Sequence, residues 1–164
     1  MDFLIHHMLR TSAMRSPEKE ALVQGEQRLT YSAVASQVAG LACGLREAGL
    51  QRGDRLGVYF DPSIPQPLSI FGIAQAGGVF VPINHLLFPD QVAHIAQDCR
   101  MKGLITTTAK LATLEKVLPN IPSLEFVVAL QDTETPNVAL PMHSFEAFCQ
   151  APPPCRRRGV NIEK

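Results

Sequence analysis

Residues 62–89 contain no Asp, Glu, Lys or Arg, and this uncharged stretch constrains the fold more than any other feature of the sequence. It is long enough to be considered as a transmembrane helix. However, the glycine pair Gly77-Gly78 and five prolines interrupt it, and these residues break a spanning helix. The prolines are Pro62, Pro65, Pro67, Pro82 and Pro89. We therefore expect no transmembrane segment, but a helix followed by a strand, both buried in a soluble α/β domain.

Apolar residues along the rest of the chain alternate between helical and strand-like spacing. The spacing predicts a hairpin within residues 20–31, with Gly25 in its turn. It predicts helices at 3–14, 31–48, 66–76, 109–118 and 143–150, and one more that starts at Pro89. It predicts strands at 55–60, 78–83, 103–107 and 124–130, and a polar loop at 131–141. This alternation predicts an α/β fold with a doubly wound, mostly parallel sheet flanked by helices.

The helix at 31–48 has the clearest pattern, because its apolar residues recur at the spacing of a core-facing stripe. The stripe consists of Val34, Val38, Leu41, Ala42 and Leu45. Thr30 is placed to cap the N-terminus of this helix, and Gly49 to end it in a left-handed conformation. Two other helices have broader apolar faces. These are Phe3, Leu4, His7, Met8 and Leu9 in the first, and Val92, Ile95, Ala96 and Cys99 in the one after Pro89.

Composition excludes several classes of function. Fifteen basic residues balance fifteen acidic ones, so there is no electrostatic reason to expect nucleic acid or an anionic membrane as a partner. The four cysteines form no CxxC pair, which favours free thiols in a reducing compartment. Asp2 stands where a signal peptide would carry positive charge. These features together predict a cytoplasmic protein.

No motif assigns a catalytic, cofactor-binding or metal-binding role to any residue of this chain. The sequence has no GxGxxG, no GxxxxGK[ST] and no GxSxG, and its five histidines are scattered. Gly77-Gly78 is predicted to be a packing turn rather than a phosphate cradle, and Arg52-Gly53-Asp54 a turn between helix and strand. His85 follows a strand end, where α/β sheets place ligand sites, although an ordinary loop histidine is the favoured interpretation.

The remaining candidates from the sequence have structural interpretations. His94 is predicted to lie at the boundary of a helix face rather than to act in catalysis. Cys99 and Cys149 are predicted to be core thiols, and Cys155 an exposed one.

Three segments resemble the adenylate-forming superfamily of acyl-CoA synthetases, luciferases and peptide-synthetase adenylation domains. The first is Leu29-Thr30-Tyr31 with the helix that ends in GLREAGLQRGDRLGVYF; the others are GIAQAGGVFVPIN at 72–84 and FPDQVAHIAQDCRMKGLIT at 88–106. The resemblance covers roughly residues 1–130 in the expected order. One departure is Ala33, where the family often has a Glu that would complete a capping box with Thr30.

This resemblance implies that residues 1–150 are the N-terminal α/β subdomain of an AMP-forming acyl-CoA synthetase, and that 151–164 are a Pro/Arg-rich linker. Such a parent enzyme uses ATP, Mg²⁺ and CoA to convert a carboxylic acid into acyl-CoA, AMP and pyrophosphate. In the family the phosphate loop, the adenine-binding motif, the ribose-binding Asp and the lid Lys come later, so none has a matching position here. We therefore expect an inactive chain whose partner is the remainder of the parent synthetase, and which self-associates when alone.

Other identities remain open. The segments LIHHML and VFVPINHLLFPDQVAHIAQDC are most similar to a bacterial acyl-CoA ligase subgroup linked to exosortase gene clusters. An amino-acid adenylation enzyme is the nearest competitor. A short, non-catalytic α/β module that binds another protein is the alternative from a different class.

Overall fold

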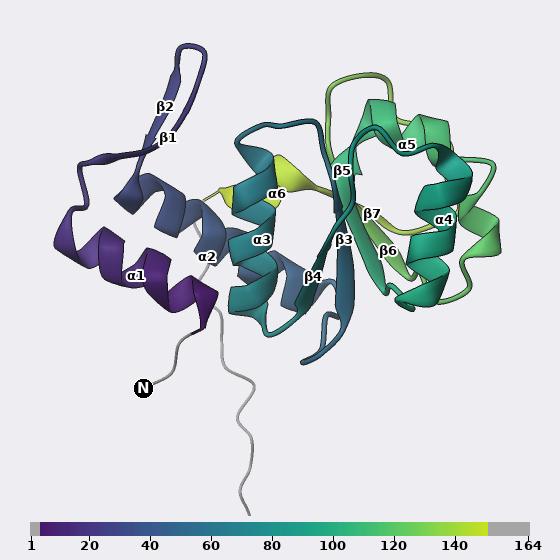
Figure 1. Cartoon of the computed structure of the whole chain (residues 1–164), viewed down its shortest axis with the longest axis horizontal. Helices are drawn as coiled ribbons and strands as arrows, with labels where there is room; N and C mark the ends of the chain where they lie inside the picture. The colour runs from purple at the N-terminus through teal and green to yellow at the C-terminus, as the bar shows by residue number, and fades with distance from the viewer. Residues whose placement is uncertain (1–3, 151–164) are drawn as a thin grey trace, which may run out of the picture.

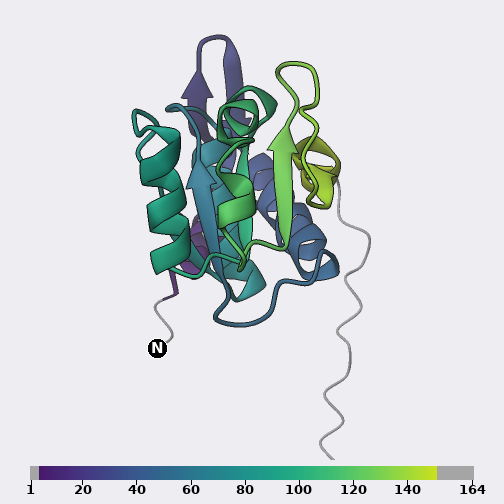
Figure 2. The same cartoon turned by 90° about the vertical axis from the view of Figure 1, so that its right-hand side faces the viewer.

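A five-stranded parallel sheet forms the centre of the computed structural model, which describes residues 4–150 (Figures 1 and 2). All of its neighbouring strand pairs are parallel. In spatial order the strands are β4 (Val79–Pro82), β3 (Arg55–Tyr59), β5 (Gly103–Thr107), β6 (Phe126–Leu130) and β7 (Met142–Ser144). The predicted fold class is therefore confirmed, with the four predicted sheet strands placed to within two residues at either end.

Helices cover both faces of this sheet. On one face lie α2 (Tyr31–Glu47), α3 (Pro65–Ala76) and α6 (Phe145–Cys149), with α1 (Ile5–Arg15) packed outside α2 and α3 (Figure 1). On the other face lie α4 (Pro89–Asp98), α5 (Thr108–Leu114) and the short 3₁₀ helix η1 (Leu118–Asn120). The antiparallel hairpin of β1 (Glu20–Gln24) and β2 (Gln27–Thr30) stands apart from the sheet. Because both faces are covered, the inner strands β3, β5 and β6 are mostly apolar and buried on both faces rather than alternating.

Successive residues of each strand enter two separate hydrophobic cores. Phe126 and Val128 point to the core beneath α2 and α3, whereas Val127 and Ala129 point to the core beneath α4 and α5. This division follows from the two-residue repeat of a strand, which sends neighbouring side chains to opposite faces.

The uncharged stretch forms α3, β4 and the loops around them. Gly77 has φ +95° and ends α3, and a Cβ on Gly78 would lie 3.0 Å from Ile73 Cγ2. The glycine pair is therefore a packing turn, as predicted. Within residues 4–150, no helix has both the length and the apolar character needed to cross a membrane.

Helix α2 confirms its sequence pattern. All five residues of the stripe are buried, the Ala33 N–H donates to Thr30 Oγ1 at 3.3 Å, and Gly49 has φ +101°. Arg46 has a second role that the sequence did not suggest. Its guanidinium donates to the carbonyl oxygens of Gln75 and Ala76, so that a side chain of α2 caps the C-terminus of α3.

Two glycines of α2 allow α6 to approach closely. A Cβ on Gly40 would lie 2.4 Å from the Phe148 carbonyl oxygen, and one on Gly44 would lie 2.4 Å from the Phe148 ring. Both glycines are one turn apart on the same face of α2, because residues i and i+4 share a face. Their missing side chains therefore make the space that α6 occupies.

The C-terminal part of the described chain corrects one prediction. Residues 143–150 were predicted to be entirely helical, but Met142–Ser144 form β7 and only Phe145–Cys149 are helical. Ser144 caps α6, accepting a hydrogen bond from the Ala147 N–H at 3.1 Å, so the helix cannot begin earlier. The three residues before it pair with β6, a tertiary contact that local spacing does not encode.

Three helices also differ from their predicted limits or faces. Helix α5 ends at Leu114 rather than at residue 118, and the chain passes through turns into η1, which contains Pro119. In α4 the fully buried residues include Ala93, while Ile95 and Cys99 are half-buried. In α1 only Leu9 is fully buried; Leu4 and Met8 are exposed, because this helix touches α2 and α3 along a narrow line.

The predicted linker at 151–164, Cys155 and Phe3 all lie outside the described residues.

An ion-pair cluster ties together the N-terminal ends of three strands. Lys102 Nζ lies 2.9 Å from Asp54 Oδ2 and 3.7 Å from Glu125 Oε2. The Gln51 N–H also donates to Asp54 Oδ2 at 2.8 Å, which makes the turn predicted for residues 52–54. Partial burial alone would raise the pKa of Asp54, but the Gln51 and Lys102 contacts outweigh it and lower this pKa. The same pair raises the pKa of Lys102.

We predict that Asp54→Asn lowers the free energy of unfolding at pH 7 by about 1–2 kcal/mol. A carboxyl with a lowered folded-state pKa stabilises the protein above its unfolded pKa of about 3.9, and this contribution is lost as the pH falls through the folded value. Urea denaturation between pH 7 and pH 3 should therefore show the gap to the wild type closing below about pH 4. Asp98→Asn, at an exposed position of α4, is the control; an equal, pH-independent loss in both variants would contradict the prediction.

Candidate functional site

The carboxyl ends of the sheet strands all lie at one end of the sheet. The strand order reverses between β3 and β5. The chain runs from β3 through α3 to β4 on one side, then crosses through α4 to β5 on the other side of β3. The loops that follow β3 and β5 consequently leave toward opposite faces of the sheet. Open α/β sheets bind ligands in the crevice at such a reversal, so this end of the sheet is the candidate site.

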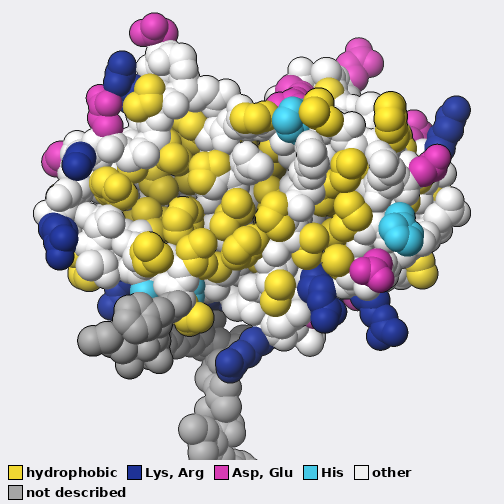
Figure 3. Space-filling view, viewed as in Figure 1, with side chains coloured by type: hydrophobic (Ala, Val, Ile, Leu, Met, Phe, Trp, Pro, Cys, Tyr) yellow, Lys and Arg dark blue, Asp and Glu magenta, His cyan; other side chains and the backbone are white. Residues whose placement is uncertain are grey.

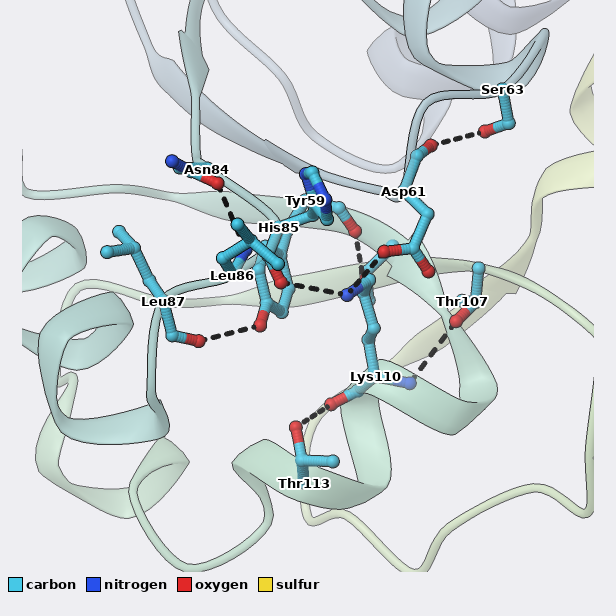
Figure 4. A network of polar contacts seen from close by, with 11 residues as sticks. Tyr59, Asp61, Ser63, Asn84, His85, Leu86, Leu87, Thr107, Lys110 and Thr113 are labelled. Carbon is cyan, nitrogen blue, oxygen red and sulfur yellow. Dashed lines mark hydrogen bonds and ion pairs between the residues drawn. The ribbon is translucent and has the colours of Figure 1, made fainter.

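Lys110 lies at the centre of a network of polar contacts at this end of the sheet (Figure 4). Its Nζ is 3.2 Å from Asp61 Oδ1, 3.2 Å from the carbonyl oxygen of His85, and 4.6 Å from the centre of the Tyr59 ring. The lysine side chain is only 15% exposed, whereas that of Asp61 is 70% exposed. One ammonium group on α5, which follows β5, therefore contacts the segments that follow β3 and β4.

Tyr59 makes a second connection at the same end of the sheet. Its hydroxyl donates to the carbonyl oxygen of Leu87 at 3.1 Å, and its own carbonyl oxygen accepts from the buried hydroxyl of Thr106 at 2.7 Å. The segment 84–88 is thus held at two backbone carbonyls, by Lys110 at His85 and by Tyr59 at Leu87. Within this segment the Leu86 N–H donates to Asn84 Oδ1 at 3.0 Å.

Asp132 organises the neighbouring loop, which follows β6. Its Oδ1 accepts from the Thr108 hydroxyl at 2.8 Å and from the Ala109 N–H at 2.9 Å, at the start of α5. Burial alone would raise the pKa of Asp132, but these hydrogen bonds outweigh it and lower the pKa. Because its hydrogen bonds go to the first turn of α5, Asp132 acts as a distant cap of that helix.

The structure assigns modest roles to the residues that the sequence singled out. His85 lies at this end of the sheet, as its position after a strand predicted, and the contact it makes with Lys110 is through its backbone carbonyl oxygen. His94 is exposed on α4. Cys99 and Cys149 are half-buried, so the prediction that they are core thiols is only partly right; Cys43 is the fully buried thiol of the described chain.

Sequence reasoning missed Tyr59, Asp61, Lys110 and Asp132. No short motif contains them, because they are far apart in the chain and meet only at the carboxyl ends of the strands. One signal was present: Asp61, Lys110 and Asp132 lie within three residues of predicted strand ends. Listing the polar residues that follow each predicted strand would have found all three.

A hollow in the surface lies on the α2 and α3 side of the same end of the sheet, beneath the hairpin. It is a surface cleft of about 600 Å³ with amide and apolar walls. Its lining includes Gln24, Gln37, Leu68, Phe145, Glu146 and Cys149. Among residues 4–150 we find no group of three or more His, Cys, Asp or Glu side chains that could hold a metal ion.

Cys149 should react slowly with thiol reagents. Burial, with a smaller contribution from Glu146, raises its pKa to about 12, so little reactive thiolate forms at pH 8. We predict that native labelling with a maleimide at pH 8 modifies Cys99 before Cys149, with mass spectrometry of tryptic peptides as the readout. All sites should react rapidly in denaturant. Labelling of Cys149 first, or a disulfide in the native mass, would contradict this prediction.

Comparison with known protein families gives one match that covers most of the chain. The profile of the family described as AMP-binding enzyme matches residues 9–156. A feruloyl-CoA synthase from Amycolatopsis is 36% identical over 131 residues, which are 77% of this chain and 26% of that protein. Tyrocidine synthase 2 from Brevibacillus parabrevis is 32% identical over 120 residues, 73% of this chain and 3% of that protein.

A solved structure agrees with these sequence matches. The anthranilate CoA ligase AuaEII, crystallised with anthranoyl-AMP, superposes with a TM-score of 0.80 at 27% identity. The superposition covers 90% of this chain and 28% of the ligase. The chain thus spans about a quarter of the length of the CoA-ligase relatives that it matches.

Proposed function

The chain belongs to the family of AMP-binding enzymes, and we propose that it is the N-terminal part of an AMP-forming acyl-CoA synthetase. One observation favours this activity within the family. The identity with feruloyl-CoA synthase, 36% over 131 residues, exceeds the 32% over 120 residues with tyrocidine synthase 2. The solved relative with 27% identity is also named as a CoA ligase.

In this proposal the parent enzyme activates a carboxylic acid with ATP and Mg²⁺ and passes the acyl group to CoA. The described residues do not themselves fit ATP phosphates or Mg²⁺. The sequence has no GxxxxGK[ST] loop, and residues 4–150 hold no cluster of three metal-ligating side chains. We therefore assign the binding of those groups to the remainder of the parent enzyme.

This chain contributes support rather than reacting groups. Its sheet brings together, at the carboxyl ends of its strands, the loops carrying Asp61 and His85 and the helix carrying Lys110. We propose that this end of the sheet forms one wall of the site where the adenylate forms, because ligands of open α/β sheets bind at the carboxyl ends of the strands.

An amino-acid adenylation domain of a peptide synthetase is the second candidate. The similarity to tyrocidine synthase 2 supports it, and both candidates belong to the same family. The two differ in the acid that is activated and in the thiol that receives it. The open reading frame downstream of Lys164 offers a first test: a continuation rich in Thr, Ser and Gly and ending in Lys would favour an enzyme over an independent binding module.

The parent protein, expressed with that continuation, decides between the two enzymes. Incubation with ATP, Mg²⁺, CoA and a panel of aryl and fatty acids should yield acyl-CoA, detected by mass spectrometry. Pyrophosphate exchange that depends on an amino acid, without acyl-CoA formation, would instead favour the adenylation domain. Absence of both activities with every acid would leave the proposed function contradicted.

The chain of 164 residues alone should neither bind Mg-ATP tightly nor turn it over. The physical reason is the missing phosphate loop, since backbone N–H groups of such a loop provide much of the affinity for phosphates. Calorimetry with Mg-ATP and a pyrophosphate-release assay with the acid panel test this. Micromolar affinity, or release above the blank without protein, would refute it.

The chain alone should also self-associate. Figure 3 shows apolar side chains spread over the face that carries α1, α3 and β4, while charged side chains lie mainly at its rim. Val79 on β4 is 48% exposed, and β4 is one of the two edge strands of the described sheet. Burying each 100 Å² of this apolar surface in a dimer would contribute about 2.5 kcal/mol of stabilisation. The unpaired backbone groups of an edge strand can also pair with another chain. A net charge of zero adds no repulsion.

Light scattering over a concentration series should therefore detect a dimer. Val79→Lys places a charge at the strand edge and should shift the protein toward the monomer. Val23→Lys, at a similarly exposed position (53%) on the hairpin, is the matched control and should leave the dimer unchanged. A wild-type monomer at high micromolar concentration that also excludes a hydrophobic dye would favour the independent module.

A further inference from the structure

We propose that Lys110 is a positioning residue, whose ammonium holds the segment 84–88 in place beside the carboxyl ends of the strands. The segment connects β4 to α4 and contains Leu86 and Phe88, whose side chains are 73% and 74% exposed. Within the segment, Leu87 is the apolar residue that packs against the core beneath α4 and α5. The contacts with Lys110 and Tyr59 restrain the backbone in addition, at the carbonyl oxygens of His85 and Leu87.

The geometry of Lys110 suits a restraint better than a surface ion pair. The carboxylate of Asp61 is 70% exposed, so water screens its attraction to the ammonium. The other contacts are the His85 carbonyl oxygen at 3.2 Å and the Tyr59 ring at 4.6 Å, and the lysine side chain is 15% exposed. The best-shielded contact therefore fixes the backbone of segment 84–88 to helix α5.

Lys110 and Tyr59, which restrain the segment, are themselves held by β5 and β3 in the middle of the sheet. The Thr107 hydroxyl accepts from the Lys110 N–H at 3.2 Å and caps α5, and Thr107 itself ends β5 in the middle of the sheet. Tyr59 is buried at the end of β3 and adds the bond from its hydroxyl to Leu87. Segment 84–88 is thus tied to two central strands, although it follows an edge strand (Figure 4).

The role of this restraint depends on the proposed function, because this end of the sheet matters for catalysis only if it is part of an adenylate-forming site. A fixed wall lowers the entropy cost of binding a ligand, since the site is already ordered before the ligand arrives. The ammonium would then act on the reaction indirectly, by holding a loop, and not by touching the reacting atoms.

Backbone ¹⁵N relaxation of the 164-residue chain tests the inference without ATP, acid or CoA, at a concentration where light scattering finds one species. Order parameters of residues 84–88 should be near 0.85 in the wild type and should fall below about 0.6 in Lys110→Met. Methionine keeps the apolar stem but cannot donate to His85. Lys110→Arg should restore most of the order, because a guanidinium can both donate and stack on Tyr59.

Two further variants separate positioning from general stability. Lys102 is about as buried as Lys110 but lies at the amino ends of the strands. Lys102→Met should therefore lower the melting temperature without loosening segment 84–88. Tyr59→Phe removes only the bond to Leu87 and should loosen the segment less than Lys110→Met does. It also keeps the test open if Lys110→Met does not fold.

Unchanged order parameters in Lys110→Met, or equal loosening in Lys102→Met, would overturn the inference. Loosening confined to segment 84–88 and rescued by arginine would support it. Neither result depends on enzymatic activity, so the inference can fail while the proposed function stands. Conversely, a parent protein without ligase activity would refute the proposed function but leave the loop measurement valid.

Discussion

Parallel pairing of the five sheet strands is the constraint on which the rest of this structure depends. A parallel connection must cross from one end of the sheet to the other, and here most of those crossings are made by helices. The helices cover both faces, so the strands between them must be apolar on both sides. The same topology brings every carboxyl end to one end of the sheet and reverses the strand order beside β3, the arrangement at which open α/β sheets bind ligands.

A lysine–aspartate ion pair lies at each end of the sheet strands, but the two pairs connect different parts of the fold. At the amino ends, Lys102 and Asp54 are both largely shielded, and their pair joins the starts of neighbouring strands. At the carboxyl ends, Lys110 faces an exposed Asp61 and a backbone carbonyl, and it joins loops instead of strands. The first pair therefore joins strands of the sheet, whereas the second joins α5 to the segments that follow β3 and β4.

The uncharged stretch, residues 62–89, contributes both to the core and to an apolar surface. Its inner side chains, such as Leu68 and Ile73, are fully buried and stabilise the core beneath α3. Its outer side chains leave an apolar face and an open strand edge on the described part of the chain (Figure 3). A domain that ended its core here would be expected to carry more charge on that face. This surface is consistent with a unit that packs against further protein.

Sequence alone determined the elements whose signals are local. The buried stripe and the Thr30 cap of α2, the turn at Gly77-Gly78 and the apolar inner strands depend on residues a few positions apart, so their spacing predicted them. The alternation of these elements was sufficient for the fold class, and three segments in order were sufficient for the family.

Tertiary structure decided what depends on distant residues. Strand β7 exists because β6 lies beside it, Gly40 and Gly44 matter because α6 crosses them, and Lys110 reaches Asp61 and His85 only after the strands align. A spacing pattern records which face of an element is apolar, but not which distant element will cover that face.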